Sequence, residues 1–263
     1  YNTDNDYSYS SVRNIDISTD GQYIVAGSDN GNVYFFHKDN STPLWNYDIG
    51  SSVSSIAISS DGQYVVANSA AENVSLFHKD NSTPLWHYTT EHQAPFVSIS
   101  ADGEYILVSD PFNLYLFDKD NSTPLWTYNT DNDYIYSSTI SADGEYIVAG
   151  SGYGPHKVHL FHKDNNTPLW IYDTTDYILS VSISANGQYI AVGSGDTGNY
   201  SNGKVELFHK NNNTPLWSYK VGEATGVAIS ADGEYIIAMT QNEAHIAKVY
   251  FFHKDNSTPL WHF

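Results

Sequence analysis

The sequence predicts an all-β fold, a six-bladed β-propeller in which each blade is a sheet of four antiparallel strands. Three observations support this prediction. The tripeptide Pro-Leu-Trp occurs six times, and its tryptophans are separated by 41, 40, 44, 47 and 44 residues. A second repeated segment, SADGEYIVAGS in its fourth copy, precedes each Pro-Leu-Trp. No segment shows the 3.6-residue periodicity of a helix, and six four-stranded units of this length are typical of a propeller.

The first half of each repeat predicts an inner pair of strands. In the second repeat, Ser54–Ser59 alternates small polar and apolar residues, as a half-buried strand does. The Ser-Asp-Gly segment that follows supplies the geometry of a tight turn. Gln63–Ser69 then contains the β-branched and aromatic residues that favour a second strand. The small side chains of the first strand suit a crowded position near the propeller axis.

The second half of each repeat predicts an outer pair of strands. Asn73–Lys79 predicts the third strand, with Leu76 and Phe77 on opposite faces. The fourth strand begins at Pro84, and proline has no amide hydrogen for a ladder, so it belongs at the start of an edge strand. The segment Pro-Leu-Trp is therefore expected on the outer rim. Its aromatic residues would pack between neighbouring blades.

We predict one domain, residues 1–263, with blades at approximately 1–47, 48–88, 89–128, 129–172, 173–219 and 220–263. The segment YNTDNDY occurs at Tyr1 and again at Tyr128, where it follows an expected outer strand. We therefore expect the ring to close with whole blades, the N-terminal segment lying against the sixth. A chain made of whole blades also fits one ring of a longer tandem array.

These repeats resemble the WD40-like and PQQ-like propeller repeats of archaea and bacteria over essentially the whole chain. The segment ISADGEYIVAGS is similar to the SPDGxxLASGS portion of WD40 repeats, although Phe36-His37 occupies the Trp-Asp position and the Gly-His pair is absent. The segment DNSTPLW resembles the tryptophan-docking motif of quinoproteins, with Pro43 in place of glycine and Trp45 too early. The resemblance implies the fold, and a fold alone does not imply an activity.

The charge of the chain restricts its partners. There are 30 acidic and 11 basic residues, for a formal net charge of −19, and Arg13 is the single arginine. Phosphate backbones need Lys and Arg, so nucleic acid and anionic membrane surfaces are poor partners. No apolar run reaches the roughly 18 residues of a membrane span, so we expect no membrane insertion. The absence of cysteine removes disulfides and thiolate catalysis.

We predict that the protein is not an enzyme and needs no cofactor. One arginine cannot form the carboxylate-binding cluster of sialidase propellers, and cationic groups for a quinone cofactor are scarce. GxSxG, HExxH and phosphate-cradling motifs are absent from the sequence. The alternative that stays open is a metal-dependent hydrolase or oxidoreductase with its site in the axial funnel, as in lactonase-type propellers.

The repeated histidines do not predict a metal site. Five of the six repeats carry a histidine eight residues before the tryptophan: His37, His78, His162, His209 and His253. These positions lie on the third strand, about 10 Å outside the first, so copies in adjacent blades are too far apart for zinc, whose ligands lie at about 2 Å. We interpret them as packing and turn-bonding residues. Structural calcium at Asp4–Asp6 or Asp131–Asp133 is a weaker alternative.

Length variation is concentrated in the links between the second and third strands and in those between blades. These two sets of loops share one face, and variable loops on a rigid scaffold commonly form binding sites. The candidate ligand-binding residues on this face are Tyr7, Glu91, His92, Asp133, Tyr134, His156, Asp176, Tyr177, Glu223 and His245. The alternative is that they are ordinary solvated loop residues.

The turn before each Pro-Leu-Trp contains an N-x-[ST] sequon, which is an acceptor for N-glycosylation in secreted proteins. The candidate acceptors are Asn40, Asn81, Asn121, Asn165, Asn212 and Asn256, and Asn73 and Asn199 add two more. The alternative is turn chemistry that was copied with the blades.

Together these observations predict a non-catalytic propeller scaffold for protein or glycan interaction at the cell surface or outside the cell. The acidic composition and the sequons favour this extracellular or cell-envelope location. A further alternative is one structural unit of a larger adhesin or filament, through self-assembly or a longer multi-propeller chain.

Overall fold

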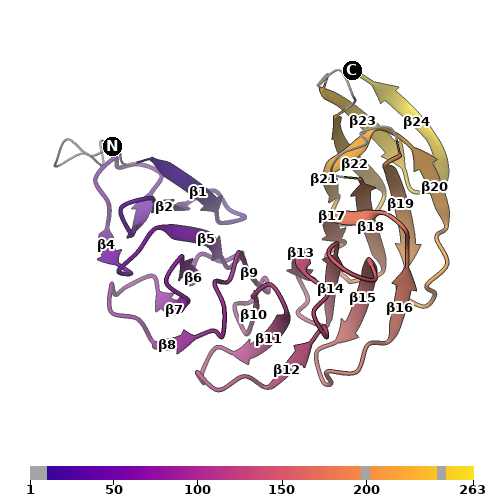
Figure 1. The fold of residues 1–263 in the computed structure, drawn as a ribbon. Coiled ribbons are helices and arrows are strands. Elements are labelled where there is room, and N and C mark those ends of the chain that lie inside the picture. The colour runs from indigo at the N-terminus through magenta and orange to yellow at the C-terminus, as the bar shows by residue number, and fades with distance from the viewer. Residues whose placement is uncertain (1–10, 197–201, 242–246) are drawn as a thin grey trace. The chain divides into compact units, whose positions relative to one another are not determined.

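The computed structural model describes residues 11–196, 202–241 and 247–263. The described residues form 24 strands and no helix. The strands make six antiparallel sheets of four, each with its strands in chain order (Figure 1). This arrangement confirms the predicted fold class, an all-β six-bladed propeller.

The chain divides into two compact units, residues 1–127 and 128–263. The sheets of the first unit contain β1 (Val12–Ile17), β2 (Tyr23–Ser28), β3 (Asn32–His37), β4 (Trp45–Asp48); β5 (Val53–Ile58), β6 (Tyr64–Ser69), β7 (Asn73–His78), β8 (Trp86–Thr89); and β9 (Phe96–Ile99), β10 (Tyr105–Ser109), β11 (Asn113–Asp118), β12 (Trp126–Asn129). The division falls within β12. The predicted single domain, closed as one ring, stays a prediction.

The sheets of the second unit contain β13 (Ile135–Ile140), β14 (Tyr146–Ser151), β15 (Lys157–His162), β16 (Trp170–Asp173); β17 (Tyr177–Ile183), β18 (Tyr189–Gly195), β19 (Lys204–His209), β20 (Trp217–Lys220); and β21 (Glu223–Ile229), β22 (Tyr235–Gln241), β23 (Ala247–His253), β24 (Asn256–His262).

A Ser-Asp-Gly turn joins the first two strands of a sheet. In the second sheet, the Ser59 hydroxyl donates to Asp61 at 2.6 Å and accepts from the Tyr64 amide at 3.0 Å. Gly62 has a φ of 71°, which favours glycine. A Cβ at Gly62 would also collide with the ring of Tyr23 in the preceding sheet. The turn therefore needs glycine both for its backbone and for packing between sheets.

The third strand of each of the first five sheets is buried on both faces. Leu76 belongs to a cluster with Trp86 and Phe117, whereas its neighbour Phe77 belongs to a cluster with Phe35. The phenylalanine at this position is fully buried in the last five repeats: Phe77, Phe117, Phe161, Phe208 and Phe252. Because strand side chains alternate, one strand contributes to the interfaces with both neighbouring sheets.

The outer strand is joined to the next sheet by its tryptophan. Trp45 stacks between Phe35 of its own sheet and Phe77 of the next, with ring centroids at 5.1 and 5.4 Å. Its indole N–H donates to the Lys79 carbonyl of the next sheet at 2.8 Å. Equivalent bonds of 2.7–2.8 Å run from Trp86 to Lys119, from Trp170 to Lys210 and from Trp217 to Lys254. The predicted packing of aromatic residues between blades is confirmed within each unit.

Candidate functional site

The loops that vary in length lie at one end of each sheet, and the repetitive turns lie at the other. In the second unit, three of the variable loops bring four tyrosines together, from the ends of β13, β14 and β17. We call the group Tyr134, Tyr136, Tyr153 and Tyr177, with His156, the tyrosine cluster. The sequence predicted Tyr134, His156 and Tyr177 as members of a binding face.

The rings of the tyrosine cluster contact one another across two neighbouring sheets. The Tyr134 and Tyr136 centroids are 5.2 Å apart, and those of Tyr136 and Tyr177 are 6.3 Å apart. Tyr177 also lies 4.7 Å from His156 and 6.5 Å from Tyr153. The side chains are half-buried, except that Tyr153 is 68% exposed. The cluster therefore presents aromatic surface to solvent.

The backbone around the tyrosine cluster has a left-handed conformation at several residues. Of the four non-glycine residues with positive φ in the described ranges, three lie here: Asp131 (54°), Asn132 (73°) and His156 (52°). Such residues are uncommon and recur at functional sites. The loops are pinned by hydrogen bonds from the Gly152 amide to the Tyr134 carbonyl at 2.9 Å and from the Thr174 amide to the His156 carbonyl at 2.9 Å.

A buried carboxylate, Asp133, lies beside the tyrosine cluster, in the residue before Tyr134. Asp133 is 1% exposed, and its Oδ2 accepts a hydrogen bond from the Ser151 hydroxyl. Its Oδ1 is buried and has no hydrogen-bond partner, and the same is true of His156 Nδ1. A Cβ at Gly154 would lie 3.3 Å from Asp133 Oδ1. The sequence also predicted Asp133 as a site residue.

The other predicted acids of the second unit have partners of a different kind. Asp176 Oδ2 lies 3.3 Å from Lys204 Nζ, so its charge is paired. Glu223 is 7% exposed at the start of β21. Burial, and then the charge of Asp196, raises the pKa of the Glu223 carboxyl. No described contact joins Glu223 to the tyrosine cluster.

Two predicted residues form a separate polar group in the first unit. Asp110 is fully buried, accepts from the Tyr115 hydroxyl at 2.8 Å, and lies 3.6 Å from His92 Nδ1. The Asn113 amide nitrogen, bonded to Asp110, reaches Glu91 Oε2 at 3.5 Å. Burial, followed by the hydrogen bond to Asp110, raises the pKa of Tyr115. Asp110 thus anchors the loop that carries Glu91 and His92.

The predicted candidates Tyr7, His245 and Asn199 lie outside the described residues. Within the described ranges, no group of three or more His, Asp or Glu side chains is arranged to hold a metal ion. The side chain of Asp133, part of the segment considered for calcium, is bonded to Ser151.

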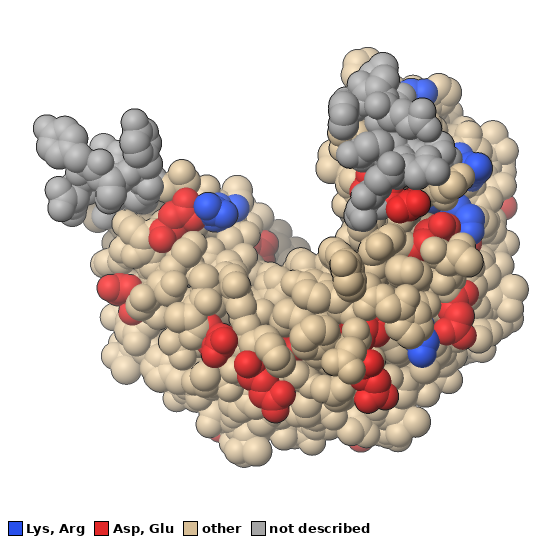
Figure 2. All heavy atoms as spheres, viewed as in Figure 1, with Lys and Arg blue, Asp and Glu red and all other residues tan. Residues whose placement is uncertain are grey.

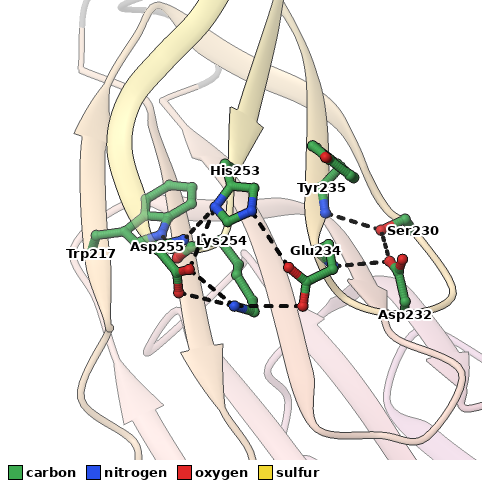
Figure 3. Close-up of polar contacts among 8 residues, drawn as sticks. All are labelled: Trp217, Ser230, Asp232, Glu234, Tyr235, His253, Lys254 and Asp255. Atoms are coloured by element: carbon green, nitrogen blue, oxygen red, sulfur yellow. Dashed lines mark hydrogen bonds and ion pairs between the residues drawn. The ribbon is translucent and has the colours of Figure 1, made fainter.

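The repeated histidines pack and bond within their turns. The His253 ring meets the Tyr235 ring edge-on at 5.5 Å, and His253 Nδ1 accepts from the Asp255 amide at 3.3 Å. Figure 3 shows this turn, in which Glu234 Oε2 lies 3.4 Å from His253 Nε2 and Oε1 lies 3.5 Å from Lys254 Nζ. The same edge-on contact joins His37, His78, His162 and His209 to a tyrosine at 5.3–5.5 Å. The interpretation as packing and turn-bonding residues is confirmed.

The sequon asparagines of the six repeated turns are exposed and share one geometry. In every copy, the asparagine side-chain oxygen accepts from the backbone N–H of the threonine two residues later, at 2.6–3.0 Å. The asparagines are Asn40, Asn81, Asn121, Asn165, Asn212 and Asn256. This Asx turn agrees with the turn-chemistry interpretation. It also leaves the amide nitrogen, the atom that is glycosylated, on the surface.

Sequence reasoning missed a variable position in the third strand that is buried in the first five sheets. Its occupants in chain order are Tyr34, Ser75, Tyr115, His159, Glu206 and Tyr250. Several face a tyrosine of the preceding sheet: Tyr172 donates to Glu206 at 3.3 Å, and the rings of Tyr128 and His159 are 5.6 Å apart. Burial is the main cause that raises the pKa of Glu206. Variation inside an otherwise constant strand was the available signal.

On the face shown in Figure 2, acidic side chains are spread over both units and basic side chains are sparse. This agrees with the formal net charge of −19. A protein of this charge attracts cationic groups over distances comparable to the Debye length, about 8 Å at physiological salt.

Comparison with known proteins shows the family. The model of a family of unknown function, DUF5711, matches residues 66–206, which is more than half of the chain. The chain belongs to the DUF5711 family. In this DUF5711 protein, residues 5–37 also match the WD domain, G-beta repeat model, which confirms the resemblance to WD40 repeats. A search of curated proteins found no match.

Among solved structures, this DUF5711 chain is similar to a chain of the crystal structure titled Mitotic Checkpoint Complex. The TM-score is 0.75 at 14% identity, over 94% of this chain and 78% of that one. At this identity the similarity supports the fold. WD40 propellers are typically non-enzymatic scaffolds for protein interaction, and the prediction of a non-enzymatic scaffold agrees with this. The described residues include no helix of the length and hydrophobicity needed to cross a membrane.

Proposed function

We propose that this protein is a non-catalytic propeller scaffold that binds a protein or glycan partner outside the cell, through the variable-loop face of its second unit. The observation that carries the proposal is the tyrosine cluster. It is built by the loops in which the repeat varies, and tyrosine is enriched at binding interfaces because it combines a large apolar ring with a polar tip. The WD40 match supports the scaffold role.

Site-specific photocrosslinking in the native host tests the binding face. A photoreactive phenylalanine analogue at Tyr153, which is 68% exposed, should crosslink to a partner. The same analogue at Leu44, 53% exposed on the turn face, is the matched control and should not. Equal products from both positions, or none from Tyr153, would reject the proposed face.

The extracellular location is supported by the net charge and by the six exposed sequons. Intact mass and cell fractionation of the protein from its native host test it. We expect the protein in the envelope or external fraction, with glycan mass that decreases when Asn40 is changed to glutamine. An unmodified protein confined to the cytoplasm would reject this part of the proposal.

A further inference from the structure

We infer that the tyrosine cluster binds a positively charged side chain, lysine or arginine, of a partner protein. The inference rests on the proposed binding face and specifies its ligand chemistry. The tyrosines occupy neighbouring sheets of one unit, so the cluster is complete within residues 128–263.

The mutual orientation of the rings favours a compact cation over a sugar. The planes of Tyr136 and Tyr177 are inclined at 81°, those of Tyr153 and Tyr177 at 65°, and those of Tyr134 and Tyr136 at 49°. Ring faces that point in different directions can surround one cationic group, which is attracted to the negative π face of each ring. Sugar stacking instead needs one flat, open ring face.

The unpaired acceptor beside the cluster, Oδ1 of Asp133, supplies the matching charge. Asp133 is 1% exposed and its Oδ1 has no partner, whereas the neighbouring Asp176 is paired with Lys204. An unsatisfied buried carboxylate oxygen carries a desolvation cost that a charged donor would offset. No other described oxygen near the cluster combines these properties.

Two glycines allow close approach at the cluster, because the rings of Tyr136 and Tyr177 pack directly against Gly152 and Gly154 lies beside Asp133. A Cβ at Gly152 would lie 2.7 Å from Tyr136 and 3.0 Å from Tyr177, and a Cβ at Gly154 would lie 3.3 Å from Asp133 Oδ1. A side chain at either position would therefore displace a ring or cover the carboxylate. Burial, followed by the neighbouring Tyr134, Tyr177 and Tyr153, raises the pKa of Tyr136, in agreement with the close ring contacts.

The inference is tested by titrating the protein, labelled in its tyrosine rings, with small probes followed by NMR. The cationic probes are the Nα-acetyl methylamides of lysine and arginine. The norleucine analogue is the neutral probe, and methyl glucoside is the sugar probe. We expect saturable shifts of the cluster tyrosines with the cationic probes and at least about tenfold weaker binding of norleucine. Equal binding of norleucine, tighter binding of the sugar, or shifts that do not saturate would overturn the inference.

Variants locate the site. Tyr177→Ala and Asp133→Asn should each weaken lysine-probe binding by about tenfold, and Tyr177→Phe, which keeps the ring, should bind within about threefold of the wild type. Tyr235→Ala, distant on the turn face, is the matched control and should not change binding. Circular dichroism and melting temperature identify unfolded variants, and Tyr177→Phe keeps the test decisive if Tyr177→Ala does not fold. Unchanged binding in folded Asp133→Asn would overturn the role of the carboxylate.

The experiments distinguish a failure of the proposed binding face from a failure of the cation inference. Crosslinking at Tyr153 tests the binding face without assuming any ligand chemistry, and the probe titration tests the chemistry without a partner. A partner captured at Tyr153 by a protein that has no preference for cationic probes would overturn the cation inference alone.

Discussion

Replacing His159 by phenylalanine tests whether a buried histidine in the third strand lowers the free energy of unfolding as the pH falls. His159 lies on β15, is 3% exposed, and packs against the rings of Tyr128 at 5.6 Å and Phe161 at 6.1 Å. Burial, followed by the positive charge of Lys157, lowers the pKa of His159 from 6.5 to about 4. Phenylalanine fits because aromatic residues occupy this position in other sheets.

The sign of the effect follows from proton linkage. Between pH 6.5 and about 4, the unfolded chain binds a proton at His159 that the folded chain does not bind. The contribution to stability is present above pH 6.5 and is lost as the pH falls. At about 1.4 kcal/mol for each pH unit between the two values, the loss reaches about 3 kcal/mol near pH 4.

Urea unfolding at pH 7, 6, 5 and 4.5, followed by fluorescence, measures this loss. The wild-type free energy of unfolding should fall by about 2 kcal/mol more than that of His159→Phe between pH 7 and 4.5. The matched control, His262→Phe, removes an exposed histidine and should keep the wild-type slope. Equal slopes for the wild type and His159→Phe would refute the argument.

Two further predictions concern the contacts between sheets. Trp45→Phe should reduce the free energy of unfolding by about 1–2 kcal/mol in urea titrations, because the Lys79 carbonyl loses its donor. Tyr153→Phe should change it by less than about 0.5 kcal/mol, since that side chain is 68% exposed; equal losses would contradict the role of the hydrogen bond. Burial and the charge of Glu206 raise the pKa of Tyr172 to about 12, so its contribution to stability is present below pH 10 and is lost as the pH rises to about 12. Melting temperatures should therefore fall less steeply above pH 10 for Tyr172→Phe than for the wild type, and identical slopes would count against this assignment.

Local sequence patterns were sufficient to predict the strands. The first strand of the second repeat was expected at Ser54–Ser59 and is observed at Val53–Ile58, and the third was expected at Asn73–Lys79 and ends at His78. The fourth begins at Trp86, two residues after the proline expected to start it. These predictions succeed because alternation and turn chemistry act over a few residues.

The candidate site was predicted only in part. Loop variation selected Asp133, Tyr134 and Tyr177 as candidates, and the ring contacts bring Tyr134 and Tyr177 into the same cluster as Tyr136 and Tyr153, which it did not indicate. Tyr136 lies within a strand and Tyr153 in a loop of the same sheet. They join Tyr177 because β13 and β14 of one sheet pack beside β17 of the next, a contact between segments distant in the chain.

The sequence by itself determined the repeat, the strand order within each sheet and the acidic surface, because each depends on local pattern or composition. The tertiary structure decided which side chains meet across sheets. It placed Tyr172 against Glu206 and Tyr128 against His159, and it left Asp133 buried with one oxygen unpaired, in the residue before Tyr134. These partners depend on how neighbouring sheets are aligned with each other. The local sequence of a repeat does not specify that alignment.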